Sequence, residues 1–178
     1  QAEPGGVVVE DEGVLDGLRR WAAEARRGGN HAWVQMNHPG RQVPASMSRE
    51  PVAPSAVPMR GTGGAFRPPR ALSHDEILLI IGRFARTAAL VKEAGFTGVQ
   101  VHAAHGYLAS QFLSPLTNQR DDAWGGDAPR RRRFLVEVVR AVRAAVGPAF
   151  PVSVKLNSAD FQRGGFSTAE SVAVVEAL

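Results

Sequence analysis

The sequence predicts an α/β fold with parallel strands, and three observations lead to this prediction. Helical and extended segments take turns along the 178 residues, in the order α-β-α-β-α-β-α. The extended segments are joined by stretches long enough to hold a helix, as parallel strands require. The composition, 44% hydrophobic and 21% charged, is that of a folded globular chain and not of a disordered or fibrous one. We therefore expect one domain over residues 1–178.

The first two elements are a helix and a strand. GVLDGLRRWAAEARR (13–27) has apolar residues on one helical face and is followed by Gly-Gly. This predicted stripe consists of Val14, Leu18, Trp21 and Ala25. HAWVQMNH (31–38) is short, with glycine before and Pro-Gly after, which predicts a buried strand. Residues 39–72 are rich in Pro and Gly without periodicity, so we expect a long loop, which in a compact domain is usually functional or mobile.

The second helix has the strongest pattern in the chain. Ser73 and Glu76 have the spacing of a capping box, and Gly95 ends the helical segment. The predicted apolar stripe is Ile77, Ile81, Phe84, Ala88 and Val91. GVQVH (98–102) then alternates apolar and polar residues, which indicates a second strand, and a loop is expected to follow it.

A third helix, a third strand and a final helix complete the pattern. RRRRFLVEVVRAVRAAVGP (130–148) predicts a helix with the stripe Phe134, Val138, Ala141 and Ala145. PVSVKLN (151–157) predicts a strand, and Ser167 with Glu170 predicts a capping box at the start of the last helix. The run of four arginines suggests either a nucleic-acid patch or the solvated side of a helix start. Because no aromatic residues are interleaved with it, we favour the solvated helix start and expect no nucleic-acid partner.

The polarity of the three strands distinguishes two architectures. Each strand has one apolar face and one face that becomes polar towards its carboxyl end. The residues of the second face are Gln35 and Asn37, then Gln100 and His102, then Ser153, Lys155 and Asn157. A doubly wound sheet is covered by helices on both faces and should have strands that are apolar throughout. A (β/α)8 TIM barrel fits better, because its catalytic groups collect at the carboxyl ends of the strands.

The number of predicted strands is too small for a complete barrel. About three strands are present, whereas a closed barrel has eight and is typically built from about 250 residues. We therefore expect the chain to be the incomplete central part of a barrel, with the long loop at 39–72. Such a part has two unpaired strand edges, which favour pairing with another chain. The sequence therefore suggests a homo-oligomer, in which the partner is a second copy of this chain.

Composition also bears on the cellular context. No apolar run approaches the roughly 20 residues of a membrane span, and the first residues lack the features of a signal peptide. The absence of cysteine excludes disulfides, thiolate metal sites and an iron–sulfur cluster within this sequence. We expect a cytoplasmic protein with no membrane partner.

The stretch GVQVHAAHGYLASQFLSP (98–115) gathers His102, His105 and Tyr107 where the strand alternation stops. Two histidines at this spacing could bind a metal, but they lack the i, i+4 spacing of zinc proteases and a nearby acidic ligand. A structural histidine pair bonded in the core is a second interpretation. The third is a pair of hydrogen-bond donors and a phenol that converge on a substrate oxygen and carbon. We expect no metal.

Longer stretches resemble a known family. VHAAHGYLASQFLSPLTNQRDDAWGG resembles the signature of the Old Yellow Enzyme family, whose members are FMN-dependent ene-reductases on a (β/α)8 barrel. VQMNHPGRQ, VAPSAV, EAGFTGVQVHAAHGY, RRRFLVEVVRAVR and VKLNSADFQRGGF agree in the same order, so the resemblance covers nearly the whole chain. The sequence departs from the family pattern at Gln100, where an acidic residue is usual.

The resemblance implies a role for five residues. Gln35 would hydrogen-bond the pyrimidine edge of FMN, and Lys155 would stabilise negative charge near flavin N1 and the C2 oxygen. His102 and His105 would hold the carbonyl or nitro oxygen of an activated alkene, the small-molecule substrate. Hydride from NAD(P)H would reach the β-carbon through the flavin, and Tyr107 would protonate the α-carbon. Arg41 and His38 would line the flavin or substrate side, but the sequence does not decide this.

Alternatives remain for the roles of single residues and for the activity of the protein. Gln35 and Tyr107 could serve only packing, whereas a lysine inside a strand is rare without a partner, which favours a role for Lys155. The enzyme could be a dienoyl-CoA reductase or an amine dehydrogenase-like flavoenzyme, or the chain could be a non-catalytic truncated half-barrel. Because the flavin site would need further strands, we expect this chain alone to bind FMN weakly or not at all.

Overall fold

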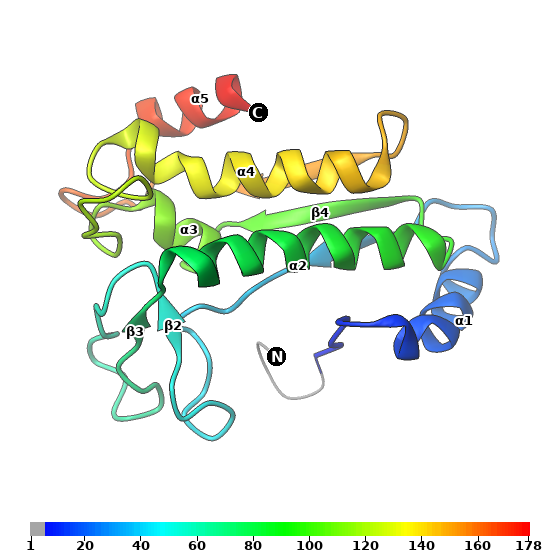
Figure 1. Cartoon of the computed structure of the whole chain (residues 1–178), viewed down its shortest axis with the longest axis horizontal. Coiled ribbons are helices and arrows are strands. Elements are labelled where there is room, and N and C mark those ends of the chain that lie inside the picture. Colours follow the sequence, from blue (N-terminus) through cyan, green and yellow to red (C-terminus); the bar gives the residue numbers. More distant parts are fainter. Residues whose placement is uncertain (1–5) are drawn as a thin grey trace.

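Three parallel strands form the central sheet of the computed structural model, which describes residues 6–178. The strands are ordered β1 (Trp33–Met36), β4 (Gly98–Ala103) and β5 (Val152–Leu156), so that β4 lies in the middle. The helices are α1 (Leu15–Ala25), which follows the 3₁₀ helix η1 (Glu12–Val14), α2 (His74–Glu93), α3 (Leu108–Leu113), α4 (Ala128–Val146) and α5 (Thr168–Ala177) (Figure 1). The predicted parallel strands with helical crossovers are confirmed.

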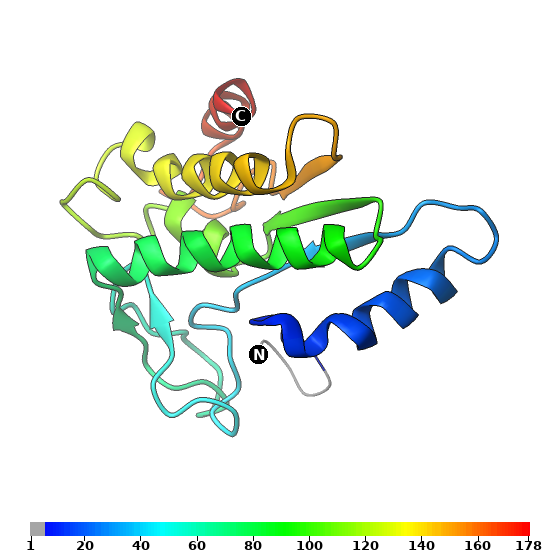
Figure 2. The ribbon, with the colours of Figure 1, turned by 45° about the vertical axis from the view of Figure 1, so that its right-hand side comes forward.

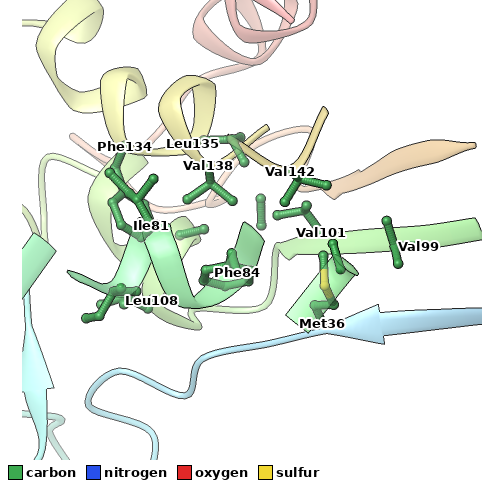
Figure 3. Close-up of a cluster of buried hydrophobic side chains, with 14 of the residues drawn as sticks. Met36, Ile81, Phe84, Val99, Val101, Leu108, Phe134, Leu135, Val138 and Val142 are labelled. Atoms are coloured by element: carbon green, nitrogen blue, oxygen red, sulfur yellow. The ribbon is translucent and has the colours of Figure 1, made fainter. Parts of the chain in front are cut away.

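The core lies between the sheet and helices α2 and α4, which run side by side along β4 (Figures 1 and 2). Val99 and Val101 project from the apolar face of β4 and are fully buried. Figure 3 shows side chains of α2 and α4 in one cluster that includes Val101, with Val99 at its edge. Phe112 of α3 stacks on Phe134 of α4 with ring centroids 4.2 Å apart. Burial of these large apolar side chains is the main source of stability, at roughly 1.5–3 kcal/mol for each one.

Both predicted capping boxes are formed. The Ser73 side chain accepts a hydrogen bond from the Glu76 backbone N–H, and the Glu76 carboxylate accepts one from the Ser73 backbone N–H. Ser167 and Glu170 repeat this arrangement at the start of α5. All five predicted stripe residues of α2 are buried. The two capping-box patterns therefore predicted the first residues of α2 and α5 to within one residue.

Three segments differ from the prediction. Residues 39–72 contain β2 (Val52–Ala53) and β3 (Arg70–Ala71), which pair in parallel, so this segment is not wholly a loop. α3 lies where a loop was predicted, and because all its residues are buried they show no apolar–polar periodicity. β1 is an edge strand with Trp33 and Gln35 exposed, and not the buried strand that its short apolar sequence predicts.

The buried faces of α1 and α4 agree only in part with the predicted stripes, since Leu18, Phe134 and Val138 are buried as predicted and other positions differ. In α1, Leu15, Leu18 and Ala22 are buried, whereas Trp21 is 47% exposed and contacts Phe96 edge-on. In α4, Val142 and Val146 are buried where Ala141 and Ala145 were predicted. Spacings of three and four residues fit two adjacent stripes equally well, so the elements that pack against each helix decide which stripe is buried.

The arginine run is only partly a solvated helix start. Arg131 is 7% exposed and donates through Nε to the Leu113 carbonyl at 3.0 Å. Its guanidinium also forms an ion pair with Glu170 at the start of α5. The Arg133 guanidinium lies over the Trp124 ring, 4.6 Å from its centroid. The run therefore ties α4 to its neighbours, which corrects the interpretation as a merely solvated face.

Candidate active site

A cavity of about 970 Å³ is lined by residues of α1 and α2, by both faces of the edge strand β1, and by side chains at the carboxyl ends of the parallel strands. This is the end at which the β4 arrow terminates in Figure 1. The cavity lining includes all five residues predicted as site residues. These are Gln35, His102, His105, Tyr107 and Lys155. The structure therefore brings together residues that are up to 120 positions apart in the sequence.

A ladder of polar side chains crosses the sheet on the cavity side. Gln35 of β1 lies opposite Gln100 of β4, and its Nε2 donates to Gln100 Oε1 at 2.6 Å. Gln100 Nε2 in turn donates to Ser153 Oγ of β5 at 3.2 Å. Since each amide has a defined partner, the direction of the Gln35 side chain is set by its neighbours. Among residues 6–178, Gln35 Oε1 has no hydrogen-bond donor, and Gln35 lines the cavity.

His102 is the most buried histidine of the site, with 5% of its surface exposed. Its Nδ1 accepts a hydrogen bond from the Ala104 backbone N–H at 3.2 Å. Burial, followed by the nearby His105 and Lys155, lowers the pKa of His102 from 6.5 to about 4. His102 is therefore neutral at pH 7, and since Nδ1 is an acceptor, its proton is on Nε2.

Three aromatic rings converge at the end of β4. The His102 and His105 ring centroids are 5.1 Å apart, and those of His102 and Tyr107 are 5.0 Å apart. Both pairs are nearly perpendicular, with interplanar angles of 81° and 80°. Tyr107 is the N-cap residue of α3, so the start of this helix fixes its position. Two imidazoles and one phenol thus share a small region of the cavity wall.

Lys155 lies opposite His102 in the register of β4 and β5. Its side chain is exposed and forms no hydrogen bond or ion pair with another residue of 6–178. The expectation that a strand lysine needs a partner because it is buried is therefore wrong. The case for Lys155 rests instead on its place in the cavity lining, where an unpaired ammonium favours an anionic ligand.

The two residues that the sequence left undecided lie differently. His38 lines the cavity, and its Nδ1 accepts from the Gly40 backbone N–H at 3.0 Å. Burial is the largest cause that lowers the pKa of His38 to about 4. Arg41 does not line the cavity, and its Nη1 donates to the carbonyl oxygens of Val57 and Pro58. Arg41 therefore braces the 39–72 segment.

Sequence reasoning missed part of the cavity wall. Arg83, Arg86 and Thr87 of α2 line the cavity, as do residues 6–10. No sequence signal identifies these residues, because they lie off the apolar stripe of α2 or in a segment without periodicity. Their place in the cavity wall depends on tertiary packing.

Two negative findings apply to residues 6–178. In this part of the chain, no three His, Cys, Asp or Glu side chains are grouped so that they could hold a metal ion. Across the same residues, no helix combines the length and apolar character that crossing a membrane requires.

Comparison with known proteins places these features in a family. The model of the NADH:flavin oxidoreductase / NADH oxidase family matches residues 1–178. The NADH-dependent flavin oxidoreductase nadA of Aspergillus parasiticus is 41% identical over 166 residues, which cover 92% of this chain and 37% of that protein.

Two solved structures are also similar. A 2-naphthoyl-CoA reductase in complex with 2-naphthoyl-CoA matches with a TM-score of 0.87 and 32% identity, over 93% of this chain and 27% of that one. The old yellow enzyme homologue from Zymomonas mobilis matches with a TM-score of 0.80 and 30% identity, over 94% and 49%. The chain thus spans less than half the length of each of these three proteins.

These likenesses confirm the predicted fold class, an α/β fold that forms part of a (β/α)8 barrel. They also confirm the resemblance inferred from the sequence motifs. The chain belongs to the NADH:flavin oxidoreductase / NADH oxidase family, the Old Yellow Enzyme family.

Proposed function

We propose that the protein containing this chain is an FMN-dependent reductase of C=C bonds conjugated to a carbonyl or nitro group, with NADH or NADPH as hydride source. The observation that carries this proposal is the convergence of His102, His105 and Tyr107, with ring centroids 5.0–5.1 Å apart, on one wall of the cavity. Gln35 and Lys155 line the same cavity. Membership of a flavin oxidoreductase family supports the flavin.

The residues present fit FMN. The pyrimidine edge of a flavin offers both hydrogen-bond acceptors and a donor, and gains negative charge on reduction. Gln35 is held in place by the ladder, and within residues 6–178 neither its carboxamide oxygen nor the Lys155 ammonium has a hydrogen-bond partner. When bound, FMN would supply the hydride chemistry, which no side chain can perform.

The chain's own residues would then act on the substrate oxygen and carbon. His102 presents Nε2–H, and His105 adds a second imidazole, so that both donate to the carbonyl or nitro oxygen. Two fixed donors stabilise the negative charge that develops there, as in an oxyanion hole. Tyr107, whose ring lies beside His102, would deliver a proton to the α-carbon through its hydroxyl.

A half-reaction experiment tests this assignment. The full-length protein is expressed with FMN, and flavin reduction by NADH and alkene reduction with 2-cyclohexenone are followed separately. We expect Tyr107→Phe to slow alkene reduction about 100-fold or more, as loss of a general acid does, and to leave flavin reduction nearly unchanged. Gln119→Ala, at an exposed position, is the control. Equal slowing of both half-reactions would contradict a proton-donor role.

One observation favours a second candidate substrate, an α,β-unsaturated acyl-CoA thioester. Residues 39–72 hold five arginines and one glutamate, an excess of four that equals the net charge of +4 of the whole chain. Arg49, Arg60 and Arg67 are exposed and have no bonded partner within residues 6–178. The similar 2-naphthoyl-CoA reductase binds a CoA thioester. A kcat/KM for crotonyl-CoA far above that for 2-cyclohexenone would favour this candidate.

A further inference from the structure

The turn Ala104–Tyr107, between β4 and α3, carries both His105 and Tyr107. The Tyr107 backbone N–H donates to the Ala104 carbonyl at 3.2 Å. The two central residues, His105 (φ 59°) and Gly106 (φ 74°), both have positive φ. Glycine adopts this left-handed conformation easily, but histidine does so only at a cost in energy. Something must hold His105 in this conformation.

Two side chains hold the backbone of His105. Asn157, directly after β5, accepts through Oδ1 from the His105 backbone N–H at 3.1 Å. Gln42, in the segment after β1, donates through Nε2 to the His105 carbonyl at 2.8 Å. These two side chains come from the segments that follow β1 and β5, the two strands that flank β4. The backbone N–H and carbonyl of His105 are thus satisfied by side chains from outside the turn.

The rest of the turn is built around this arrangement. A Cβ atom at Gly106 would lie 2.5 Å from Gln42 Nε2, so the absence of a side chain makes room for the glutamine. The Gly106 N–H donates to Ser110 Oγ, and its carbonyl accepts from Gln111 Nε2 at 2.7 Å. The backbone groups of both left-handed residues therefore have partners that stabilise the conformation.

We propose that Gln42 and Asn157 are positioning residues for His105. By holding its backbone in the left-handed conformation, they direct its imidazole towards the cavity, beside the His102 ring. Neither Gln42 nor Asn157 is among the residues that line the cavity, so each acts through His105. The proposal rests on the proposed function, in which His105 donates a hydrogen bond to the substrate oxygen. A merely structural role would lower stability without a selective effect on binding of that oxygen.

The test uses the FMN-loaded full-length protein and cyclohexanone, a saturated ketone that offers the oxygen without a reducible C=C bond. Its dissociation constant is read from the change in flavin absorbance. Gln42→Met keeps the side-chain length and removes the donor, whereas Asn157→Ala removes the acceptor. Each is expected to weaken cyclohexanone binding about three- to tenfold, as loss of one positioning hydrogen bond would. Gln119→Met, at an exposed position, should have no effect.

Two further variants separate positioning from general damage. Asn157→Asp keeps an oxygen acceptor for the His105 N–H and should bind cyclohexanone within about twofold of the parent protein. In a His105→Ala background, Gln42→Met should cause no further loss, because the glutamine acts through the histidine. Losses that add in the double variant would overturn the proposal. If Gln42→Met fails to fold, the comparison of Asn157→Ala with Asn157→Asp decides.

The outcome for His105→Ala distinguishes failure of the proposed role of His105 from failure of the positioning role of Gln42 and Asn157. Unchanged cyclohexanone binding in His105→Ala would show that the histidine does not hold the substrate oxygen, and the proposed role of His105 would fail together with this proposal. Weaker binding in His105→Ala, with unchanged binding in both Gln42→Met and Asn157→Ala, would overturn the positioning role alone.

Discussion

His102 should stay neutral when the solution is acidified well below the pKa of an ordinary histidine. Its pKa in the folded chain is lowered to about 4, first by burial and then by His105 and Lys155, whereas 6.5 is the reference value for the unfolded chain. Between these two values the unfolded state binds a proton that the folded state does not. Stability from His102 is therefore fully present above pH 6.5 and is lost as the pH falls towards 4.

The size of this loss follows from the two pKa values. Each pH unit below 6.5 costs about 1.4 kcal/mol until the folded pKa is reached. At pH 5, about 1.5 units below the reference value, acidification costs about 2 kcal/mol through His102 alone. Because His102 lines an open cavity, solvent screening makes about 2 kcal/mol an upper limit for this cost.

Urea unfolding at pH 8 and pH 5 measures the effect, with His102→Gln as the matched variant. Glutamine does not titrate, so the chain with His102 should lose up to about 2 kcal/mol more on acidification than the variant does. Contributions from other titrating groups, His38 included, cancel in this comparison. An equal loss in both proteins, or an NMR titration of the His102 ring centred near pH 6.5, would refute the reasoning.

Three other predictions concern the core, the loop and the cofactor. Phe134→Ala removes a fully buried ring stacked on Phe112 and should lower the free energy of urea unfolding by about 3–5 kcal/mol; a loss below about 1 kcal/mol would argue against this core. Changing Arg49, Arg60 and Arg67 together to glutamine should flatten the salt dependence of KM for an acyl-CoA, because exposed charges are screened by salt; parallel salt curves would remove their role. After gel filtration, the isolated 178-residue chain should retain less FMN than the full-length protein. A stoichiometric yellow complex of the isolated chain would contradict this.

Local signals predicted most of the fold. The capping boxes at Ser73 and Ser167 involve residues three positions apart, so the sequence contains everything needed to form them. The alternation of β4 likewise depends on neighbouring residues only. The five site residues were found from family motifs, and the structure shows that they line one cavity, but their chemical roles stay predictions.

The features that the sequence did not predict depend on distant partners. The arginine run predicts that Arg131 is exposed, yet Arg131 forms an ion pair with Glu170, 39 positions away. α3 is missed because a short, fully buried helix has no polar side. The positive φ of His105 also has no local signal apart from the following glycine, because the groups that hold it come from the segments after β1 and β5.

The polar face of the sheet explains why the barrel interpretation and the site were found together. A single strand that alternates valine with polar residues fits any half-buried strand. Here three neighbouring strands repeat the alternation, and parallel register sets Gln35 opposite Gln100 and His102 opposite Lys155. Such a polar wall would be costly beneath a layer of helices, because its amides and charges would lose water without compensation. It is stable where it faces a cavity, and that cavity is where a polar cofactor edge and a substrate oxygen could bind.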